Sequence, residues 1–313
     1  AFTQCTKQLR TIQKYFFLEA ILKFSWITKR DDPKTLKKFL NAQGISHRMY
    51  RRLKTNGGEF LVNDREVDGA VSLHDGDRIE VIMPDEVSDP NVAVSDGPIV
   101  VVFEDANWLV VDKQAGLTVV PGPANRNDTL VNRIKGHLIA EGATDLVPHI
   151  ITRLDRFTSG LVLVAKHQLA NSLANDLLTA KTLHKRYQAV VSGTGLKAHG
   201  MIDKPIAKDP EGFGQLIDDQ GKSAQTEYWV RGEFVDRTLV DVVLHTGRTH
   251  QIRVHFASIG HPLLGDALYH GPMDEGISRQ ALHATELQFV DPFSKKEFKF
   301  ESQLPADILQ VIH

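Results

Sequence analysis

Polar and apolar residues alternate along several short stretches in the second half of the chain. The alternation runs through 185–192, 223–232 and 239–246, and its period of two is that of a half-buried β-strand. A continuous apolar run at 160–166 indicates a strand that is buried on both faces. Further strands are expected at 98–103, 108–112, 281–289 and 296–301.

Three stretches of the same region repeat their apolar residues at helical spacing instead. Asp128 is the expected N-cap of a helix that ends before Gly142. A second helix is expected at 167–180 and a third at 248–259. Because strands outnumber helices and several connections are short enough for hairpins, the pattern predicts an α+β fold with a largely antiparallel sheet flanked by helices.

The first third of the chain has the pattern of a small module. A helix is expected from Pro33 to just before Gly44, because proline favours the first helical position and glycine the position after the end. Ser46 can cap a second short helix. Two extended segments follow at 59–63 and 77–83.

Charge is distributed unevenly over this part of the chain. Residues 29–65 include ten basic and four acidic side chains, a net of +6, whereas 66–98 include nine acidic and one basic, a net of −8. The composition of 84–98, rich in Pro, Gly, Asp and Ser, is typical of a linker. We therefore expect an N-terminal extension at 1–28, a small domain at 29–84, an acidic linker at 85–97 and a larger domain at 98–313.

Composition narrows the class of protein. The 313 residues are 42% hydrophobic and 24% charged, which is typical of a globular chain and excludes a disordered one. The formal net charge of −2 argues against a uniformly basic protein, although local basic patches are compatible with it. The single cysteine, Cys5, excludes an internal disulfide and a cysteine-based zinc site, which fits the cytoplasm. No transmembrane helix is expected, and the partly apolar N-terminal stretch is better explained as an amphipathic extension than as a secretory signal.

Several motifs can be set aside. The Gly-x-Gly at 193–195 follows a strand, but the residues after it break a helix, which argues against a dinucleotide site. Ser159 lacks the earlier glycine of a hydrolase nucleophile elbow. Three histidines five residues apart, His245, His250 and His255, are better explained as polar residues with hydrogen-bond partners than as metal ligands, because neighbours in this series lie on different faces.

Cations gather on the two helices expected in the small module. They are Lys37, Lys38, Arg48, Arg51, Arg52 and Lys54. A solvated helix face is the simplest interpretation, but clustering on one short helix pair is better explained by binding to phosphates. Together with Gly-x-x-x-Val-Asn at 58–63 and Asp-Gly-Asp at 75–77, the pattern resembles the αL RNA-binding motif of ribosomal proteins. That resemblance implies two helices on a small sheet that grip structured RNA by its backbone.

Asp155 lies between two arginines in the segment Arg-Leu-Asp-Arg-Phe-Thr-Ser-Gly (153–160), directly ahead of the buried strand. A lone aspartate in such a place commonly caps a turn or forms a surface ion pair. A functional carboxylate needs a positive partner to stay ionised where water is excluded, and a rigid element behind it. The arginines and the apolar run favour the functional interpretation of Asp155.

The segment resembles the signature of RluA-type pseudouridine synthases, and other motifs of that family follow in order from about residue 98 to the end. They are Asp-Lys-x-Ala-Gly-Leu (112–117), Lys-x-Tyr-x-Ala-x-Val (185–191), Gly-Lys-x-Ala-x-Thr-x-Tyr (221–228), Gly-Arg-Thr-His-Gln-Ile-Arg (247–253) and Gly-x-Pro-x-x-Gly-Asp-x-x-Tyr (260–269). With the αL-type module in front, the architecture resembles the branch that modifies large-subunit ribosomal RNA. Thr152 departs from the family pattern, which more often has histidine there.

The resemblance implies a pseudouridine-synthase fold and the isomerisation of uridine, in which uracil leaves ribose C1′ through N1 and is rejoined through C5. Asp155 would act as nucleophile at C1′ or as base at C2′, and the sequence leaves both open. Arg253 would pair with Asp155 and keep it ionised. Tyr187 would stack on the uracil, although packing within a strand would also explain it. Arg153 would fill the space left by the flipped-out uridine.

This reaction requires no cofactor and no metal, because no group is gained or lost. The expected partner is RNA, ribosomal RNA above all, and the expected state is a monomer. A non-catalytic RNA-binding or ribosome-assembly factor with the same fold is the alternative, and a hydride-transfer enzyme is a more distant one. The presence of Asp155, Tyr187 and Arg253 favours the enzyme, since a binder needs phosphate contacts but no buried carboxylate.

Overall fold

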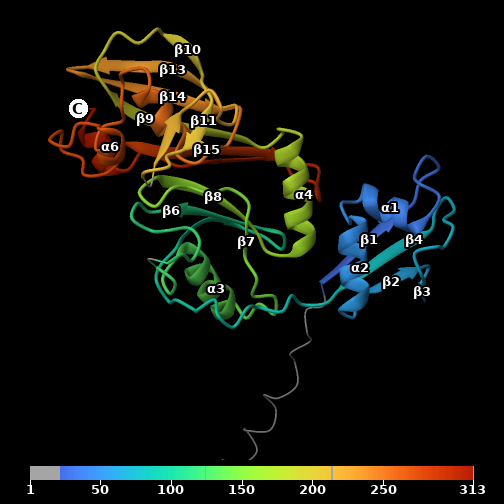
Figure 1. Cartoon of the computed structure of the whole chain (residues 1–313). Helices are drawn as coiled ribbons and strands as arrows, with labels where there is room; N and C mark the ends of the chain where they lie inside the picture. The colour runs from blue at the N-terminus through green and yellow to red at the C-terminus, as the bar shows by residue number, and fades with distance from the viewer. Residues whose placement is uncertain (1–21, 124, 213, 313) are drawn as a thin grey trace, which may run out of the picture. The chain divides into compact units, whose positions relative to one another are not determined.

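The chain forms two compact units. The computed structural model describes residues 22–123, 125–212 and 214–312 (Figure 1). The first unit consists of the chain up to Val87 together with the short segment Gly142–Leu146. The second consists of Ser88–Glu141 and the chain from Val147 onward.

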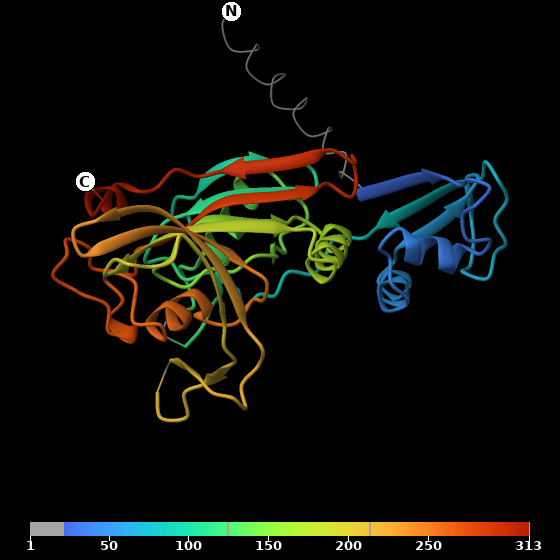
Figure 2. The ribbon, with the colours of Figure 1, turned by 90° about the horizontal axis from the view of Figure 1, so that it is seen from above.

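The first unit is a four-stranded antiparallel sheet with two helices. Its elements are β1 (Leu22–Ile27), α1 (Leu36–Ala42), α2 (His47–Thr55), β2 (Glu59–Val62), β3 (Arg65–Glu66) and β4 (Arg78–Met83). The strand order is β1-β4-β2-β3, and Figure 2 shows both helices on one face of the sheet. The apolar residues of each helix, such as Leu40 and Leu53, are buried there. Ser46 caps α2 as predicted, since its hydroxyl accepts a hydrogen bond from the Met49 N–H at 3.3 Å.

The boundary expected at residue 28 was wrong, because β1 belongs to this sheet. Leu22 to Ile27 pair in antiparallel register with Met83 to Arg78 of β4. The partner strand lies more than 50 residues further along the chain, so local periodicity could not reveal the pairing. The rest of the expected extension, 1–21, lies outside the described residues, as does Cys5.

The segment expected as an acidic linker packs against the second unit over most of its length. The Asn132 side chain donates to the Ala93 carbonyl at 2.7 Å, and Lys135 donates to the Val92 carbonyl at 2.8 Å. Asp128 accepts from Ser95 instead of capping the helix that follows. The N-cap is the next residue along the chain, Thr129, which shares a capping box with Asn132.

The second unit is built on one large sheet. Its strands are β5 (Val100–Glu104), β6 (Trp108–Lys113), β7 (His149–Ile150), β8 (Ser159–Ala165), β9 (His184–Ser192), β10 (His199–Asp203), β13 (Gln225–Phe234), β14 (Arg237–Leu244), β15 (Leu282–Val290) and β16 (Glu297–Glu301). The order is β10-β13-β14-β9-β15-β8-β6-β5, with β16 beside β15 and β7 beside β8. Among these described strands, β15 and β8 form the one parallel pair, so the predicted α+β fold with a largely antiparallel sheet is confirmed.

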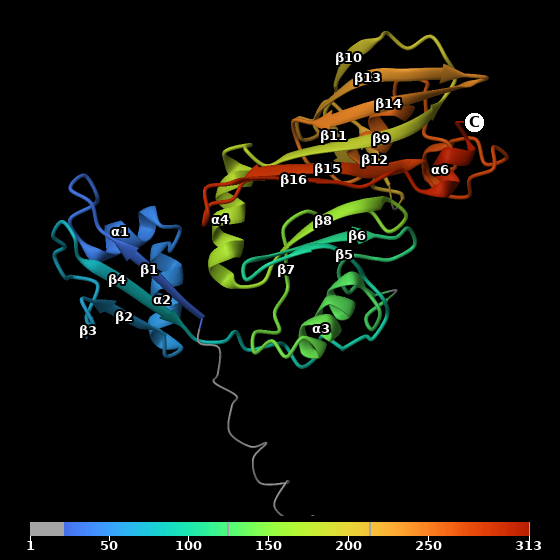
Figure 3. The ribbon, with the colours of Figure 1, turned by 180° about the vertical axis from the view of Figure 1, so that it is seen from behind.

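Helices and a small hairpin complete the second unit. They are α3 (Leu130–Ala140), α4 (Gln168–Thr179), α5 (Gln251–Ala257), the 3₁₀ turn η1 (Ala267–Tyr269), α6 (Ala306–Gln310) and the hairpin β11 (Ile206–Lys208) with β12 (Gln215–Ile217). Figure 3 shows α3 beside the β5–β6 end of the sheet. Within the part of the chain that the structure describes, no helix has the length and apolar character that a membrane crossing requires.

Helix α5 is shorter than the sequence predicts. It begins at Gln251, because His250 adopts a left-handed backbone conformation (φ 54°) that interrupts the helix. The Gln251 side-chain oxygen accepts from the backbone N–H of Arg248 and from the Thr246 hydroxyl, which closes the preceding segment into a turn. Ile252 and Phe256 pack into the core beneath the sheet, and this packing fixes the direction in which the helix presents its other residues.

Candidate active site

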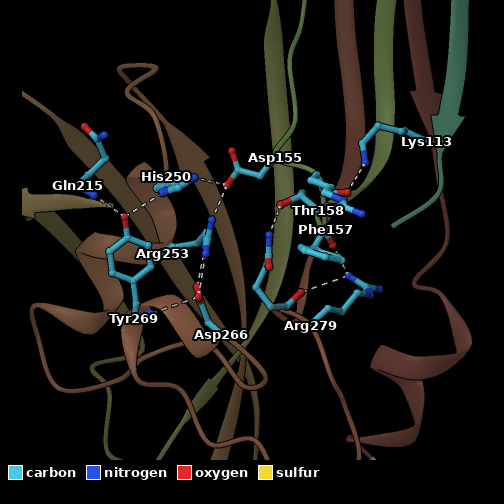
Figure 4. Close-up of polar contacts among 12 residues, drawn as sticks. Lys113, Asp155, Phe157, Thr158, Gln215, His250, Arg253, Asp266, Tyr269 and Arg279 are labelled. Atoms are coloured by element: carbon cyan, nitrogen blue, oxygen red, sulfur yellow. Dashed lines mark hydrogen bonds and ion pairs between the residues drawn. The ribbon is translucent and has the colours of Figure 1, made fainter. Parts of the chain in front are cut away.

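The loop at 153–158 is held firmly at the start of β8. Lys113 is buried and donates to the carbonyl of Arg156 at 3.1 Å, while Gly116 donates its N–H to the same carbonyl at 2.9 Å. On the other side, Arg279 donates to the Phe157 carbonyl at 3.1 Å (Figure 4 shows Lys113 and Arg279). Arg279 also donates hydrogen bonds to both carboxylate oxygens of Asp307. Hydrogen bonds from two sides therefore fix the backbone that carries Asp155.

Asp155 lies at the wall of a pocket and is paired with a buried cation. Its Oδ2 accepts from the Nη1 of Arg253 at 3.1 Å, and the side chain is 28% exposed (Figure 4). Among the described residues no partner is found for its second oxygen, Oδ1. The pairing that the resemblance implied brings together two residues 98 positions apart, and it leaves one carboxylate oxygen available.

Arg253 makes its bidentate interaction, the fork formed by Nε and Nη2, with Asp266 and not with Asp155. Nε donates to Asp266 Oδ2 at 2.7 Å and Nη2 donates to Asp266 Oδ1 at 2.8 Å, so only Nη1 remains for Asp155. The guanidinium also lies 5.0 Å from the ring centre of Tyr269. Burial opposes the charge, but the hydrogen bonds that Arg253 donates to Asp266 and the negative charges of Asp266 and Asp155 outweigh it, and the pKa of Arg253 is raised.

His250 also faces the carboxylate. Its Nε2 lies 3.9 Å from Asp155 Oδ2, and its Nδ1 lies 2.9 Å from the Tyr269 hydroxyl. The same hydroxyl accepts the backbone N–H of Gln215 at 2.8 Å, so β12 is linked to the site (Figure 4). Burial lowers the pKa of His250.

The pocket brings together the residues that the sequence singled out in the larger domain. Arg153, Asp155, Tyr187 and Arg253 all line it. Tyr187 is buried on β9, and burial first, then the charge of Asp155, raises the pKa of its hydroxyl. An adjoining hollow shares Arg153, Asp155 and Tyr187 and adds Lys185. Tyr187 therefore forms part of a cavity wall, which strand packing alone would not require.

Thr152, which departs from the family pattern, has a structural place. Its hydroxyl accepts the Leu163 N–H at 2.8 Å, and its own N–H donates to the Leu163 carbonyl at 3.3 Å. The side chain is buried. Thr152 thus ties the loop to the middle of β8, and the side chain is engaged in holding the backbone.

The other two histidines of the series have hydrogen-bond partners. His255 is buried, with one ring nitrogen 2.8 Å from the Thr226 hydroxyl and the other 2.9 Å from the Lys204 carbonyl. His245 pairs with Glu227 at 2.8 Å. Over the described ranges, no three His, Cys, Asp or Glu side chains are grouped so that they could hold a metal ion.

The sequence assigned no role to Lys113, His250, Asp266 or Tyr269, although all four fall in the quoted motifs. Burial is the largest influence on Lys113 and lowers its pKa to about 7, against the opposing charge of Asp155. A buried lysine or aspartate at a motif position is a signal of a tertiary partner, but its partner cannot be read from the sequence. Only the fold identifies the Asp266–Arg253 and Tyr269–His250 pairs.

The six cations that the sequence singled out in the first unit are exposed on α1 and α2. Lys54 is paired with Asp68 at 2.9 Å, and the Lys37 ammonium lies 5.5 Å from the ring centre of Tyr50. For the other four no ion pair is found within the described residues. They are Lys38, Arg48, Arg51 and Arg52. The three arginines are spaced three and four residues apart and so share one face of α2.

Known proteins share this fold. Human RNA pseudouridylate synthase domain containing 4 has a TM-score of 0.57 at 21% identity, over 68% of this chain and 92% of that one. Human RNA pseudouridylate synthase domain containing 1 has a TM-score of 0.54 at 22% identity, over 70% and 94%. The second unit therefore has the fold of a pseudouridine synthase.

Sequence comparison identifies the family. The family model for RNA pseudouridylate synthase matches residues 107–258. The Bacillus subtilis protein named uncharacterized RNA pseudouridine synthase YjbO is 36% identical over 89% of this chain and 98% of its own length. The ribosomal large subunit pseudouridine synthase D of Xanthomonas campestris is 34% identical over 82% of this chain and 80% of its own. The chain belongs to the RNA pseudouridine synthases of the RluA type, and it is an isomerase that acts on RNA.

Proposed function

We propose that the protein converts uridine to pseudouridine in structured RNA of the large ribosomal subunit, with Asp155 as the catalytic carboxylate. One observation carries the assignment of Asp155. Its carboxylate lines the pocket with one oxygen held by the buried Arg253. The names of relatives such as the ribosomal large subunit pseudouridine synthase D of Zymomonas mobilis, 37% identical over 68% of this chain and 71% of its own length, support the choice of RNA.

The contacts of Asp155 suit a group that acts at the ribose. Arg253 holds Oδ2 at 3.1 Å, and Oδ1 has no partner in the described part of the chain. A carboxylate of this kind can attack C1′ as uracil leaves, or remove the proton at C2′. Tyr187, in the pocket wall, would stack on the uracil, and Arg153, exposed at the rim, would take the place of the flipped-out nucleotide.

The test is Asp155→Asn, which keeps the shape of the side chain and removes its charge. Release of tritium from RNA labelled at C5 of uridine measures turnover, because that hydrogen must leave when the new bond forms. We expect a loss of about 10²–10⁴-fold or more, with the RNA Kd unchanged. Asp176→Asn, at an exposed position of α4, is the matched control. Turnover of Asp155→Asn within tenfold of the parent would exclude this role.

We further propose that the first unit is an αL-type domain that binds the RNA backbone. The four exposed cations without ion pairs lie on α1 and α2, and α2 has no acidic residue in its first turn. Replacing these four with glutamine should make the log–log dependence of affinity on salt shallower by up to about 3.6 units, since each phosphate contact contributes about 0.7–0.9. The control replaces four exposed lysines of the second unit, Lys181, Lys197, Lys295 and Lys296. Equal slopes for the two variants would show that α1 and α2 do not bind phosphates.

The RNA substrate is tested directly by mapping pseudouridines in ribosomal and transfer RNA from cells that lack the protein. Loss of a pseudouridine from large-subunit RNA, restored by the parent gene but not by Asp155→Asn, is the expected result. Loss confined to transfer RNA would overturn the choice of substrate and leave the chemistry intact.

A further inference from the structure

His250 lies in the pocket beside Asp155 but has no role in the chemistry proposed above. Its side chain is 17% exposed, and its backbone is left-handed, with φ 54° and ψ 18°. A histidine in this conformation costs about 1 kcal/mol or more relative to ordinary backbone, and such strain concentrates at functional sites. The conformation places the imidazole at the N-terminus of α5, three residues before Arg253.

The hydrogen bonds of Tyr269 determine which ring nitrogen of His250 carries the proton. The Tyr269 hydroxyl accepts the N–H of Gln215 at 2.8 Å, and the next polar atom on it is His250 Nδ1 at 2.9 Å. If Nδ1 carried a proton, the hydroxyl would receive two donors, and none of the described residues would accept its own hydrogen. The hydroxyl therefore donates to Nδ1, and the proton of the neutral imidazole is on Nε2.

The Nε2–H of His250 is left for a group that enters the pocket. Asp155 Oδ2 lies 3.9 Å away, which is too far for a hydrogen bond, and it already accepts from Arg253. The other charged groups near the imidazole are Arg253 and Asp266, which are joined to each other. Burial keeps the pKa of His250 below its ordinary value, so the ring is neutral at neutral pH.

We propose that His250 is a second catalytic residue, which donates a hydrogen bond from Nε2 to a uracil oxygen, and that Tyr269 is the positioning residue that fixes its tautomer. This inference rests on the proposed isomerisation at Asp155. When the N1–C1′ bond breaks, its electron pair stays on uracil and is shared by the ring oxygens. A fixed donor stabilises that charge. C5 then attacks C1′, and the bond from C1′ to Asp155 breaks, or, if Asp155 acted as base, the proton it took returns to C2′. The C5 proton passes to water and N1 takes a proton from water, so the product is an isomer of the substrate. His250 keeps its own proton throughout.

Removal of the imidazole is the first test, and the backbone decides the variant. Glycine adopts positive φ without cost, so His250→Gly removes the ring and preserves the fold. We expect the single-turnover rate of tritium release to fall about 10²–10³-fold, with the RNA Kd unchanged, and imidazole added to the buffer to restore part of it. His270, also left-handed (φ 60°) and exposed, provides the matched control His270→Gly, which should keep the parent rate. A rate for His250→Gly within threefold of the parent would overturn the proposal.

The second test is spectroscopic and needs no RNA. The ¹⁵N shifts of the histidine rings in the full-length protein distinguish a protonated from an unprotonated ring nitrogen. We expect His250, assigned by its loss in His250→Gly, to be protonated on Nε2 alone, and Tyr269→Phe to give a mixture of tautomers with a reduced turnover rate. A proton on Nδ1 in the parent would contradict the tautomer assignment. If the parent protein released no tritium from any RNA, the proposed function would fail instead, whatever the NMR result.

Discussion

Replacing Arg253 with lysine separates the geometry of the guanidinium from its charge. Arg253 makes three charge-assisted hydrogen bonds, two to Asp266 at 2.7 and 2.8 Å and one to Asp155 at 3.1 Å. An ammonium is a single rotatable donor group and cannot span both carboxylates in this arrangement. If the ammonium of the Arg253→Lys variant stayed on Asp266, one bond of the fork and the bond to Asp155 would be lost.

Each lost bond has its own measurable consequence. A hydrogen bond to a charged group contributes about 1.5–3 kcal/mol, so loss of one fork bond should lower the free energy of unfolding by about that amount. Loss of the bond to Asp155 should raise the activation barrier similarly, which corresponds to a rate roughly 10- to 150-fold lower. Urea unfolding measures the first effect and single-turnover tritium release measures the second.

The control for Arg253→Lys is Arg126→Lys, an arginine that is exposed in the second unit. This change conserves charge in the same way and should alter neither quantity by more than a few tenths of a kcal/mol. Unchanged single-turnover kinetics in Arg253→Lys would refute the pairing of Arg253 with the reacting carboxylate. A fall in rate without any loss of stability would refute the energetic importance of the fork on Asp266.

Two further changes test the framework around the site. His167 caps α4 by accepting the Ala170 N–H, and burial lowers the pKa of its imidazole to about 4. The contribution of the neutral ring to stability is therefore complete above pH 6.5 and is lost as the pH falls toward 4. In His167→Asn, which retains a cap, the free energy of unfolding should depend less on pH over that window, by up to about 1.4 kcal/mol per pH unit. Gly160 has φ 112°, and a Cβ there would lie 2.3 Å from the Ala284 carbonyl oxygen. Gly160→Ala should therefore lower the midpoint of thermal unfolding by several degrees or prevent folding. An unchanged midpoint would show that β8 and β15 can move apart without loss of stability.

Local patterns determined most of the elements and the position of the reactive loop. Alternation located β9, β13 and β14, and helical spacing located α3 and α4, because these signals depend on residues a few positions apart. The segment around Asp155 was identifiable for the same reason, since a charged residue between arginines ahead of an apolar strand is a feature of consecutive residues.

Contacts between distant residues were decided by the tertiary structure alone. The sheet register pairs β1 with β4 and sets β8 parallel to β15, although these strands are far apart in the chain. Within the site, the fork of Arg253 could have been satisfied by either of two carboxylates, and the packed structure places it on Asp266, which is buried beside it. The proposed tautomer of His250 depends likewise on the Tyr269 hydroxyl, 19 residues away, and on the backbone N–H of Gln215 in the β11–β12 hairpin. Hydrogen bonds of this kind depend on ångström-scale positions, and those positions exist only once the chain has packed.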